Sequence, residues 1–210
     1  MSHQRLHKNI WQLCYNGTMK KHRTSNYIFE LGTLKKFKHS GTILAGVREP
    51  DSIAEHVQRS AIIGYILAKA EKADAEKTAF LCLIHDNAET RITDLHKVAK
   101  RYIQTPGAEK KAYRDQVKNL PASLAEIFYD SFMEYENKTS KEGLIARDAD
   151  MLETAFQAKE YLDLGYTACQ DWISNVKKCL KTKSARKLLK EMEKTTFTDW
   201  WRDLKKIEGY

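Results

Sequence analysis

An all-α fold is the class that the sequence predicts, and three observations lead to it. Apolar residues recur at helical spacing along most of the chain, whereas the period-two alternation of half-buried strands is nearly absent. Only 9 of the 210 residues are Gly and 3 are Pro, so few positions interrupt a helix. With 42% hydrophobic and 30% charged residues, the composition is that of a globular domain. It excludes a disordered chain.

The first long helix is predicted over 53–70. Ser52 and Glu55 form the pattern of a capping box in front of an apolar stripe. A second helix is predicted to begin after Asp74, and its later part is apolar on all sides, as in the middle of a core. It runs into the polar segment 85–91. Because buried polar groups cost free energy unless they are paired, this segment is the first functional candidate.

The same periodicity predicts the remaining helices, with approximate ranges 93–102, 108–119, 122–136, 141–164, 168–181 and 184–208. Gly165 is a suitable end for the longest of them. Residues 1–24 show weak periodicity and are expected to form an arm or a helix. Residues 25–210 are expected to form a single domain.

The charge of the chain is unevenly distributed. The net charge is +8, but segment 51–164 carries more acidic than basic residues, and both flanks are basic. A basic balance suits an anionic ligand. The basic clusters 20–23 and 177–190 keep a nucleic-acid-binding module open as an alternative. Neither cluster belongs to a recognised binding motif, so nucleic acid is the less favoured partner.

The sequence gives no sign of a membrane segment or a disulfide framework. Its apolar runs are far shorter than the ~20 residues of a membrane-spanning helix. The first eight residues lack the apolar stretch of a secretory signal, so a cytoplasmic location without membrane contact is expected. The 4 cysteines show no C-x-x-C spacing, which argues against disulfides and a zinc–thiolate site.

A set of histidines and carboxylates predicts a divalent metal site. It comprises His56, the adjacent pair His85–Asp86, and either Asp148 or Asp150 on the helix predicted over 141–164. Imidazole and carboxylate ligands together suit Mn, Co, Fe, Zn or Mg. Taken singly, each residue is more often a core histidine or a capping aspartate, and the combination is what points to a metal. Four protein ligands leave positions open for substrate, as in catalytic sites.

Further polar residues are candidates for catalysis and phosphate binding. Glu89 lies four residues after His85 and so on the same helical face, where it can act as an acid or a base. Arg59 lies one turn beyond the first histidine and can meet a phosphate. Lys100 and Arg101 are two more candidates for that contact, although solvated surface charges fit them equally well.

Four sequence blocks resemble the HD-domain metal-dependent phosphohydrolases. They are GVREPDSIAEH at 46–56, IHDNAE at 84–89, ITDL at 92–95 and ADML at 149–152. Over roughly residues 27–205 the chain is similar to the branch that contains the bacterial 5'-deoxynucleotidases and their archaeal and human relatives. The resemblance implies a helical bundle with a metal site in a central cleft. It also implies Asp150, rather than Asp148, as the fourth ligand.

The resemblance implies roles for two more acidic residues and a metal count. Glu89 would be the general acid or base, and Asp94 would help to orient the attacking water, while a helix N-cap fits Asp94 equally well. Relatives with two metals place additional histidines between the His-Asp pair and the last aspartate, where only His96 stands. One divalent ion per chain is therefore expected. A homodimer is implied as well.

The resulting hypothesis is a metal-dependent phosphomonoester hydrolase that acts as a 5'-nucleotidase on (deoxy)ribonucleoside 5'-monophosphates. Members of the branch carry an Arg-Trp pair associated with sugar recognition, whereas segment 38–42 here reads Lys-His-Ser-Gly-Thr. This difference leaves another phosphoester open as substrate, such as a triphosphate, a cyclic nucleotide or a phosphorylated metabolite. The second alternative is a non-catalytic basic module that binds nucleic acid around a structural metal.

Overall fold

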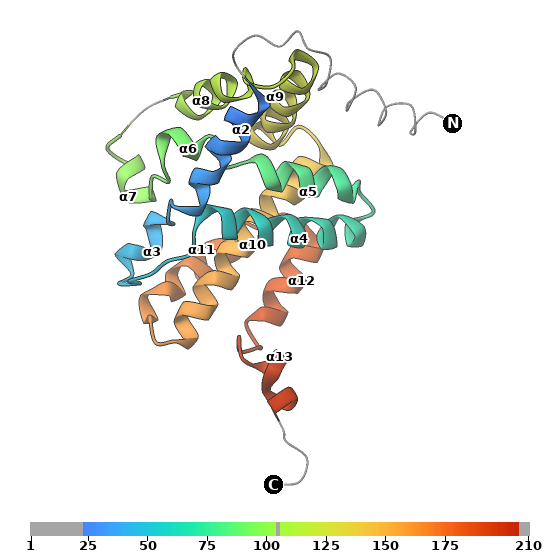
Figure 1. Ribbon diagram of the computed structural model, residues 1–210. Coiled ribbons are helices and arrows are strands. Elements are labelled where there is room, and N and C mark those ends of the chain that lie inside the picture. Colours follow the sequence, from blue (N-terminus) through green and yellow to red (C-terminus); the bar gives the residue numbers. More distant parts are fainter. Residues whose placement is uncertain (1–22, 104–105, 206–210) are drawn as a thin grey trace.

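The computed structural model describes residues 23–103 and 106–205 (Figure 1). Every regular element in this part of the chain is helical, which confirms the all-α prediction. Extended backbone pairs there at a single isolated bridge between Lys38 and Ser52. The arm or helix predicted for the N-terminus lies outside the described residues, except for its last two positions.

The helices of eight residues or more are α2 (Thr24–Leu31), α4 (Ile53–Glu71), α5 (Ala75–Ile84), α8 (Ala108–Val117), α9 (Ala122–Asn137), α10 (Lys141–Asp163), α11 (Gln170–Cys179) and α12 (Lys183–Met192). Shorter α-helical turns are α3 (Ser40–Leu44), α6 (Glu89–Ile92), α7 (Lys97–Lys100) and α13 (Asp199–Arg202). Three 3₁₀ turns complete the set: η1 (Gly32–Lys35), η2 (Thr167–Cys169) and η3 (Asp203–Lys205).

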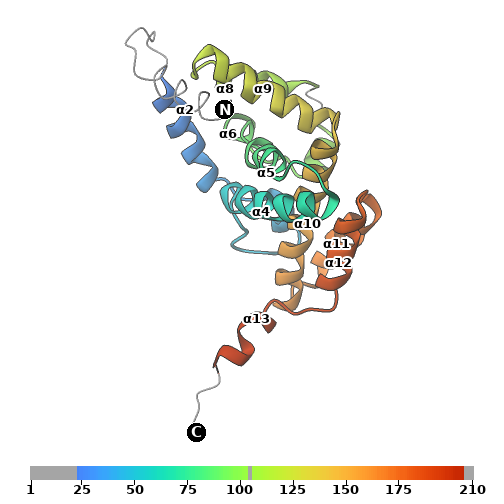
Figure 2. The same cartoon turned by 90° about the vertical axis from the view of Figure 1, so that its right-hand side faces the viewer.

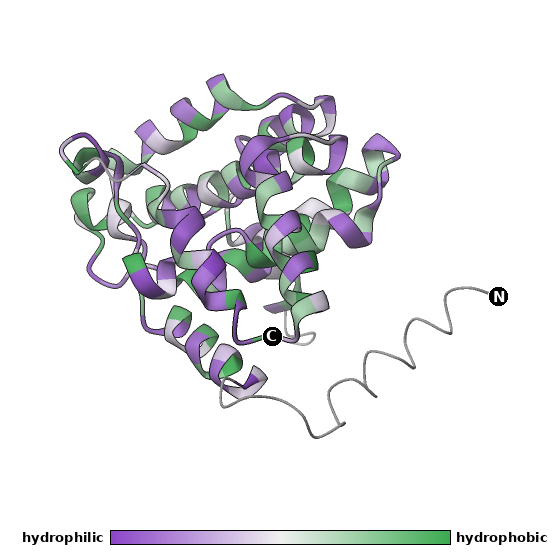
Figure 3. Ribbon diagram, turned by 90° about the horizontal axis from the view of Figure 1, so that it is seen from above, coloured by the Kyte–Doolittle hydropathy of each residue, from purple (hydrophilic) through white to green (hydrophobic). Residues whose placement is uncertain are grey.

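Helices α4, α5 and α10 form the centre of the bundle, with α11 and α12 packed on α10 and α4 (Figures 1 and 2). Hydrophilic and hydrophobic residues are interspersed along most helices, as amphipathic packing requires (Figure 3). The approach of α4 to α5 depends on Gly64, since a Cβ at this position would lie 2.7 Å from the Cys82 sulfur. Helix α13 extends away from this core (Figure 2).

The predicted helix ends are confirmed where the capping pattern was clear. Ser52 and Glu55 form the capping box at the start of α4. Asp74 accepts a hydrogen bond at the start of α5. Gly165 follows α10 with a φ of +104°, a left-handed conformation that glycine adopts without strain.

Two predicted helices differ from the structure. The helix expected over 184–208 ends at Met192, and only the short α13 and η3 follow among the described residues. The backbone N–H and the hydroxyl of Thr196 both donate to the Asp199 carboxylate, and such a local turn competes with a continuous helix. In place of a helix over 93–102 there is only the short α7, whose first turn is capped by His96.

No helix in the described ranges combines the length and the apolar character needed to cross a membrane.

Candidate metal centre

The four predicted metal ligands come from three helices of the central bundle. His56 lies in the first turn of α4, which the capping box holds in place. The apolar helix α5 ends at its C-cap His85, and Asp86 follows directly. Asp150 lies near the middle of α10. Because α4, α5 and α10 pack on one another, these side chains converge in the interior, and both histidines are buried.

The ligand atoms of this group lie at mutual distances that fit one ion. His56 Nε2 is 3.3 Å from His85 Nε2, 3.3 Å from Asp150 Oδ1 and 3.6 Å from Asp86 Oδ2. His85 Nε2 is 3.1 Å from the same Asp86 oxygen. Ligands ~2.0–2.2 Å from a common ion would be separated by roughly 3–3.6 Å at tetrahedral or adjacent octahedral positions. His56, His85 and Asp150 therefore form a group that can hold a divalent metal, and the Asp86 carboxylate lies beside both histidines.

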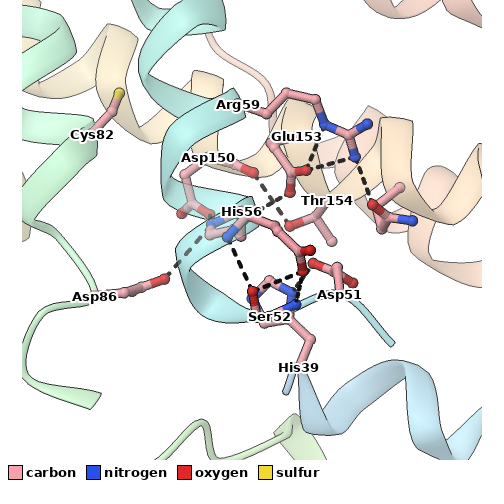
Figure 4. A network of polar contacts seen from close by, with 12 residues as sticks. His39, Asp51, Ser52, His56, Arg59, Cys82, Asp86, Asp150, Glu153 and Thr154 are labelled. Atoms are coloured by element: carbon pink, nitrogen blue, oxygen red, sulfur yellow. Dashed lines mark hydrogen bonds and ion pairs between the residues drawn. The ribbon is translucent and has the colours of Figure 1, made fainter. Parts of the chain in front are cut away.

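Both histidines use their other ring nitrogen as a hydrogen-bond donor. His56 Nδ1 contacts the Glu153 carboxylate on α10, and His85 Nδ1 lies 2.6 Å from the Cys82 carbonyl oxygen. Such partners fix the ring orientation and make Nε2 the nitrogen that can bind a metal in place of a proton. In Figure 4, Asp86 and Asp150 approach His56 from a different side than Glu153. The two Nε2 atoms thus face each other and two carboxylates, which is the arrangement of metal ligands.

The electrostatics of the group favour a cation. Burial disfavours the protonated form of His85, but Asp86 and Asp150 outweigh it and raise the pKa of this histidine to about 10. Burial likewise opposes ionisation of Asp150, yet hydrogen bonds from His56 and His85 hold its pKa well below the usual value. A divalent ion would supply the positive charge that the buried carboxylates otherwise draw from protons.

A cavity of about 280 Å³ opens beside this group, and Glu89 lines it. Asp86, with a side chain that is 21% exposed, is the ligand that faces it most openly. Glu89 Oε2 is buried and has no hydrogen-bond partner among the described residues. Burial, reinforced by the carboxylates of Asp86 and Asp94, raises the pKa of Glu89 to about 9. A carboxylic acid that stays protonated at neutral pH can donate a proton into the cavity.

Basic and phenolic side chains form another part of the cavity wall. Lys100 lines it and lies 3.5 Å from Glu109, whereas Arg101 is exposed and does not line it. Arg147 contacts the Asp150 carboxylate, to which the Tyr135 hydroxyl also donates at 2.7 Å. The cavity therefore combines a metal-binding group with the basic side chains of Lys100, Lys138 and Arg147, which a phosphate anion can contact, and the carboxylates of Glu109 and Glu136 line it as well.

The residues that orient the ligands were not predicted from the sequence. Arg147 and Glu153 stand three residues before and three residues after Asp150, so both lie on its helical face. Both residues could have been predicted from that spacing. Tyr135 comes from α9, and nothing in the sequence indicates that its hydroxyl reaches α10.

Two predicted residues, Arg59 and Asp94, bind partners outside the ligand group. The guanidinium of Arg59 is bound to α10, at 2.8 Å from Glu153, 2.8 Å from Gln157 and 2.5 Å from Glu160. The Asp94 carboxylate accepts the backbone N–H of Ser40 at 2.8 Å.

Asp148 does not reach the metal centre. Its buried carboxylate accepts hydrogen bonds from the backbone N–H groups of Lys181 and Thr182, between α11 and α12. Of the two aspartates that the spacing left open, Asp150 is the one that lies beside the histidines.

Comparison with known proteins assigns the fold to a family. A family model described as HD domain matches residues 31–193, more than half of the chain. The chain belongs to the HD domain family. The expectation drawn from the four sequence blocks is thereby confirmed.

Several proteins named 5'-deoxynucleotidase are similar to this chain. The 5'-deoxynucleotidase HDDC2 of Homo sapiens is 28% identical over 137 residues, which cover 64% of this chain and 66% of that protein. The protein of the same name from Dictyostelium discoideum is 31% identical over 150 residues, or 65% and 78% of the two chains. The match thus spans slightly less than two thirds of the human relative's length.

A solved structure, described as a conserved hypothetical protein from Pyrococcus furiosus, has a TM-score of 0.69 to this HD domain protein and is 28% identical to it. The match covers 82% of this chain and 100% of that chain.

Proposed function

We propose that this HD domain protein is a metal-dependent phosphomonoester hydrolase that releases phosphate from nucleoside 5'-monophosphates, with deoxynucleotides as the preferred class. One observation carries the proposal: the Nε2 atoms of His56 and His85, whose Nδ1 atoms are engaged elsewhere, face two carboxylates beside a cavity lined by Lys100 and Arg147. His56, His85, Asp86 and Asp150 would hold a divalent ion, with Mn, Co, Mg, Zn and Fe all compatible with this donor set.

A bound divalent ion would polarise a phosphate oxygen and acidify water. Glu89, with its raised pKa, would donate a proton to the sugar oxygen as the P–O bond to that oxygen breaks and water supplies the new oxygen on phosphorus. Asp94, oriented by Ser40, would help to position that water.

The basic side chains of the cavity wall are the candidates for binding the phosphate. Lys100, predicted from the sequence, lines this wall together with Arg147. The partners of Arg59 favour a different role, because its guanidinium is already bound by Glu153, Gln157 and Glu160. We therefore assign the phosphate contact to Lys100 and Arg147, and we assign to Arg59 the positioning of Glu153.

The names of the relatives support the substrate class. Proteins of 27–31% identity from vertebrates, a slime mould and two yeasts are each named 5'-deoxynucleotidase. They favour a hydrolase over a basic nucleic-acid-binding module. The homodimer and the cytosolic location expected from the sequence stay predictions, which light scattering and cell fractionation test.

The deciding experiment measures phosphate release by metal-stripped protein resupplied with Mn²⁺, Co²⁺, Mg²⁺ or Zn²⁺. Substrates are matched 5'-deoxy- and 5'-ribonucleoside monophosphates, the corresponding triphosphates and a cyclic nucleotide. We expect the wild-type protein to release phosphate from the monophosphates only with metal, and faster from the deoxy series. The His85→Ala variant should release none. His96→Asn is the matched control, since His96 caps α7 outside the cavity and should not be needed for turnover. Release from only the triphosphates or the cyclic nucleotide would assign a different substrate.

A further inference from the structure

Glu89, the acid of the proposed reaction, is placed by a short stretch of backbone. It opens α6, which has only 4 residues, and its Oε2 is buried without a hydrogen-bond partner among the described residues. A helix of this length is not stable in water by itself. The chain leaves α6 at Thr93 with a φ of +62°, a value that residues other than glycine seldom adopt. The direction of the Glu89 side chain therefore depends on what the rest of the protein does to hold α6.

The carboxylate of Glu30, on α2, binds the two residues that follow Glu89 (Figure 1). The Thr90 hydroxyl lies 3.0 Å from Glu30 Oε1. The Arg91 guanidinium donates from Nε to Oε1 at 2.5 Å and from a terminal nitrogen to Oε2 at 3.0 Å. Burial raises the pKa of Glu30, but the hydrogen bonds from Arg91 and Thr90 outweigh it and hold the pKa below its usual value. Glu30 is thus a charged, two-pronged acceptor that ties α6 to α2.

Gln116, on α8, holds the backbone on both sides of Glu89. Its side chain is fully buried. The amide nitrogen Nε2 lies 3.1 Å from the Asn87 carbonyl, 3.0 Å from the Thr90 hydroxyl and 3.3 Å from Glu30 Oε1. Because a carbonyl and a carboxylate can only accept, the nitrogen end of the amide must face them. Gln116 therefore joins α8 to α2 and to the turn that carries the acid.

Asn87 connects this set of contacts to the metal centre. It stands between the metal ligand Asp86 and Glu89 in the sequence, and it is buried. Its Nδ2 donates to the hydroxyl of Tyr27 on α2 at 3.2 Å, while its carbonyl accepts from Gln116. The distance between the ion position and the acid is thus set by hydrogen bonds from two helices outside the ligand group.

We propose that Glu30 and Gln116 are positioning residues for Glu89, holding α6 so that the Glu89 carboxyl stays in the cavity beside the metal centre. The inference rests on the proposed function and deepens it. Neither residue lines the cavity, so both act through the backbone of α6. A general acid works only within hydrogen-bond reach of the leaving oxygen, and a misplacement of ~1 Å caused by a remote substitution costs roughly 100-fold in rate.

The test compares steady-state kinetics of wild type, Glu30→Gln and Gln116→Met on the deoxynucleoside 5'-monophosphate that wild type hydrolyses fastest, with saturating Mn²⁺. The first variant removes the charge and the second removes the amide, while both nearly keep the side-chain volume. We expect kcat to fall by about 10–100-fold, with KM and Mn²⁺ affinity close to wild type. Tyr129→Phe is the matched control, because it removes a hydrogen bond that Arg114 of α8 donates at 2.8 Å without touching α6. It should keep the wild-type kcat.

The same substitutions in a Glu89→Gln background show whether the effect passes through the acid. With Glu89 already replaced, Glu30→Gln and Gln116→Met should lower kcat no further, because the group that they position is gone. A general structural role would lower kcat by the same factor in both backgrounds. That result, or a wild-type kcat in both single variants, would overturn the inference.

Hydrogen exchange of the metal-free protein tests the positioning without any turnover. The backbone N–H groups of Glu89, Arg91 and Thr93 donate within segment 86–93 and report on α6. They should exchange faster in Glu30→Gln and Gln116→Met than in wild type or Tyr129→Phe, while unchanged exchange in α4 shows that each variant is folded. Wild-type exchange of these groups in both variants would overturn the inference. Wild-type protein that releases no phosphate would overturn the proposed function instead, so the two failures are distinct.

Discussion

The imidazole of His56 donates from Nδ1 to the carboxylate of Glu153, and this buried contact joins α4 to α10 at the metal centre (Figure 4). Glu153 is 1% exposed and also accepts a hydrogen bond from Arg59 Nε at 2.8 Å. Its charge therefore does two things. It holds the His56 ring in one orientation, and it makes Nε2 a stronger donor to a cation.

Replacing Glu153 should weaken metal binding without removing a ligand. We expect Glu153→Gln to lose about 10–100-fold in metal affinity, the range typical of such supporting contacts. Competition with a chromogenic chelator measures this. Gln157→Ala is the control, because Gln157 contacts the same Arg59 but not His56. An affinity of Glu153→Gln equal to that of wild type would show that the carboxylate charge is not needed.

Glu89 should make the metal-free protein less stable as the pH rises. Burial, then Asp86 and Asp94, raise the pKa of Glu89 to about 9 from the 4.5 of an unperturbed group. Between these values the folded chain binds more protons than the unfolded one, so the free energy of unfolding falls with rising pH. Glu89→Gln removes this dependence. Its melting temperature should exceed that of wild type by more at pH 8 than at pH 5.

Thermal melts of metal-stripped wild type and Glu89→Gln at both pH values provide the check. A gap in melting temperature that stays constant with pH would contradict the raised pKa. The Mn²⁺ affinity of Glu89→Gln should stay close to that of wild type, because Glu89 is not one of the candidate ligands.

Local signals in the sequence predicted the central helices and the ligand group. The capping box at Ser52 and the apolar run before His85 fix where α4 and α5 begin and end. Those helix ends in turn place the ligands. The sequence was less informative where a contact joins distant segments. His39 meets Asp51 and His56 only because two stretches of extended backbone pair across a loop.

The contacts of charged residues could not be predicted from helical spacing either. Helical spacing places Arg59 one turn beyond His56, but spacing does not say which helix packs above it. Because α10 packs there, the guanidinium of Arg59 contacts Glu153, Gln157 and Glu160. At the C-terminal end, periodicity predicted one long helix, whereas the side chain of Asp199 closes a local turn with Thr196.

Gly64 should tolerate no side chain. A Cβ there would stand 2.7 Å from the Cys82 sulfur, where α4 packs on α5. We expect Gly64→Ala to lower the free energy of unfolding by about 1–3 kcal/mol, the usual cost of overpacking. Urea denaturation of the metal-free protein measures it. Gly32→Ala is the control, since Gly32 has a φ of −58° and no atom within 4 Å of the added Cβ.

Substitutions of Asp148 and Asp150, two residues apart on α10, should differ in their effect on metal binding. Asp148 is 1% exposed and accepts the backbone N–H groups of Lys181 and Thr182 at 3.0 Å and 2.7 Å. Asp148→Ala would leave both donors unpaired in the interior. It should lower the free energy of unfolding by about 2–4 kcal/mol and leave the metal affinity of the folded protein unchanged.

Asp150→Ala should abolish metal binding, because its oxygen lies 3.3 Å from His56 Nε2. It should also destabilise the metal-free protein, because Tyr135, Arg147 and the histidines would lose their partner, so metal affinity is what distinguishes it from Asp148→Ala. Denaturation and metal titration of both variants separate the two effects. Loss of metal from folded Asp148→Ala would contradict the assignment of Asp150 as the ligand.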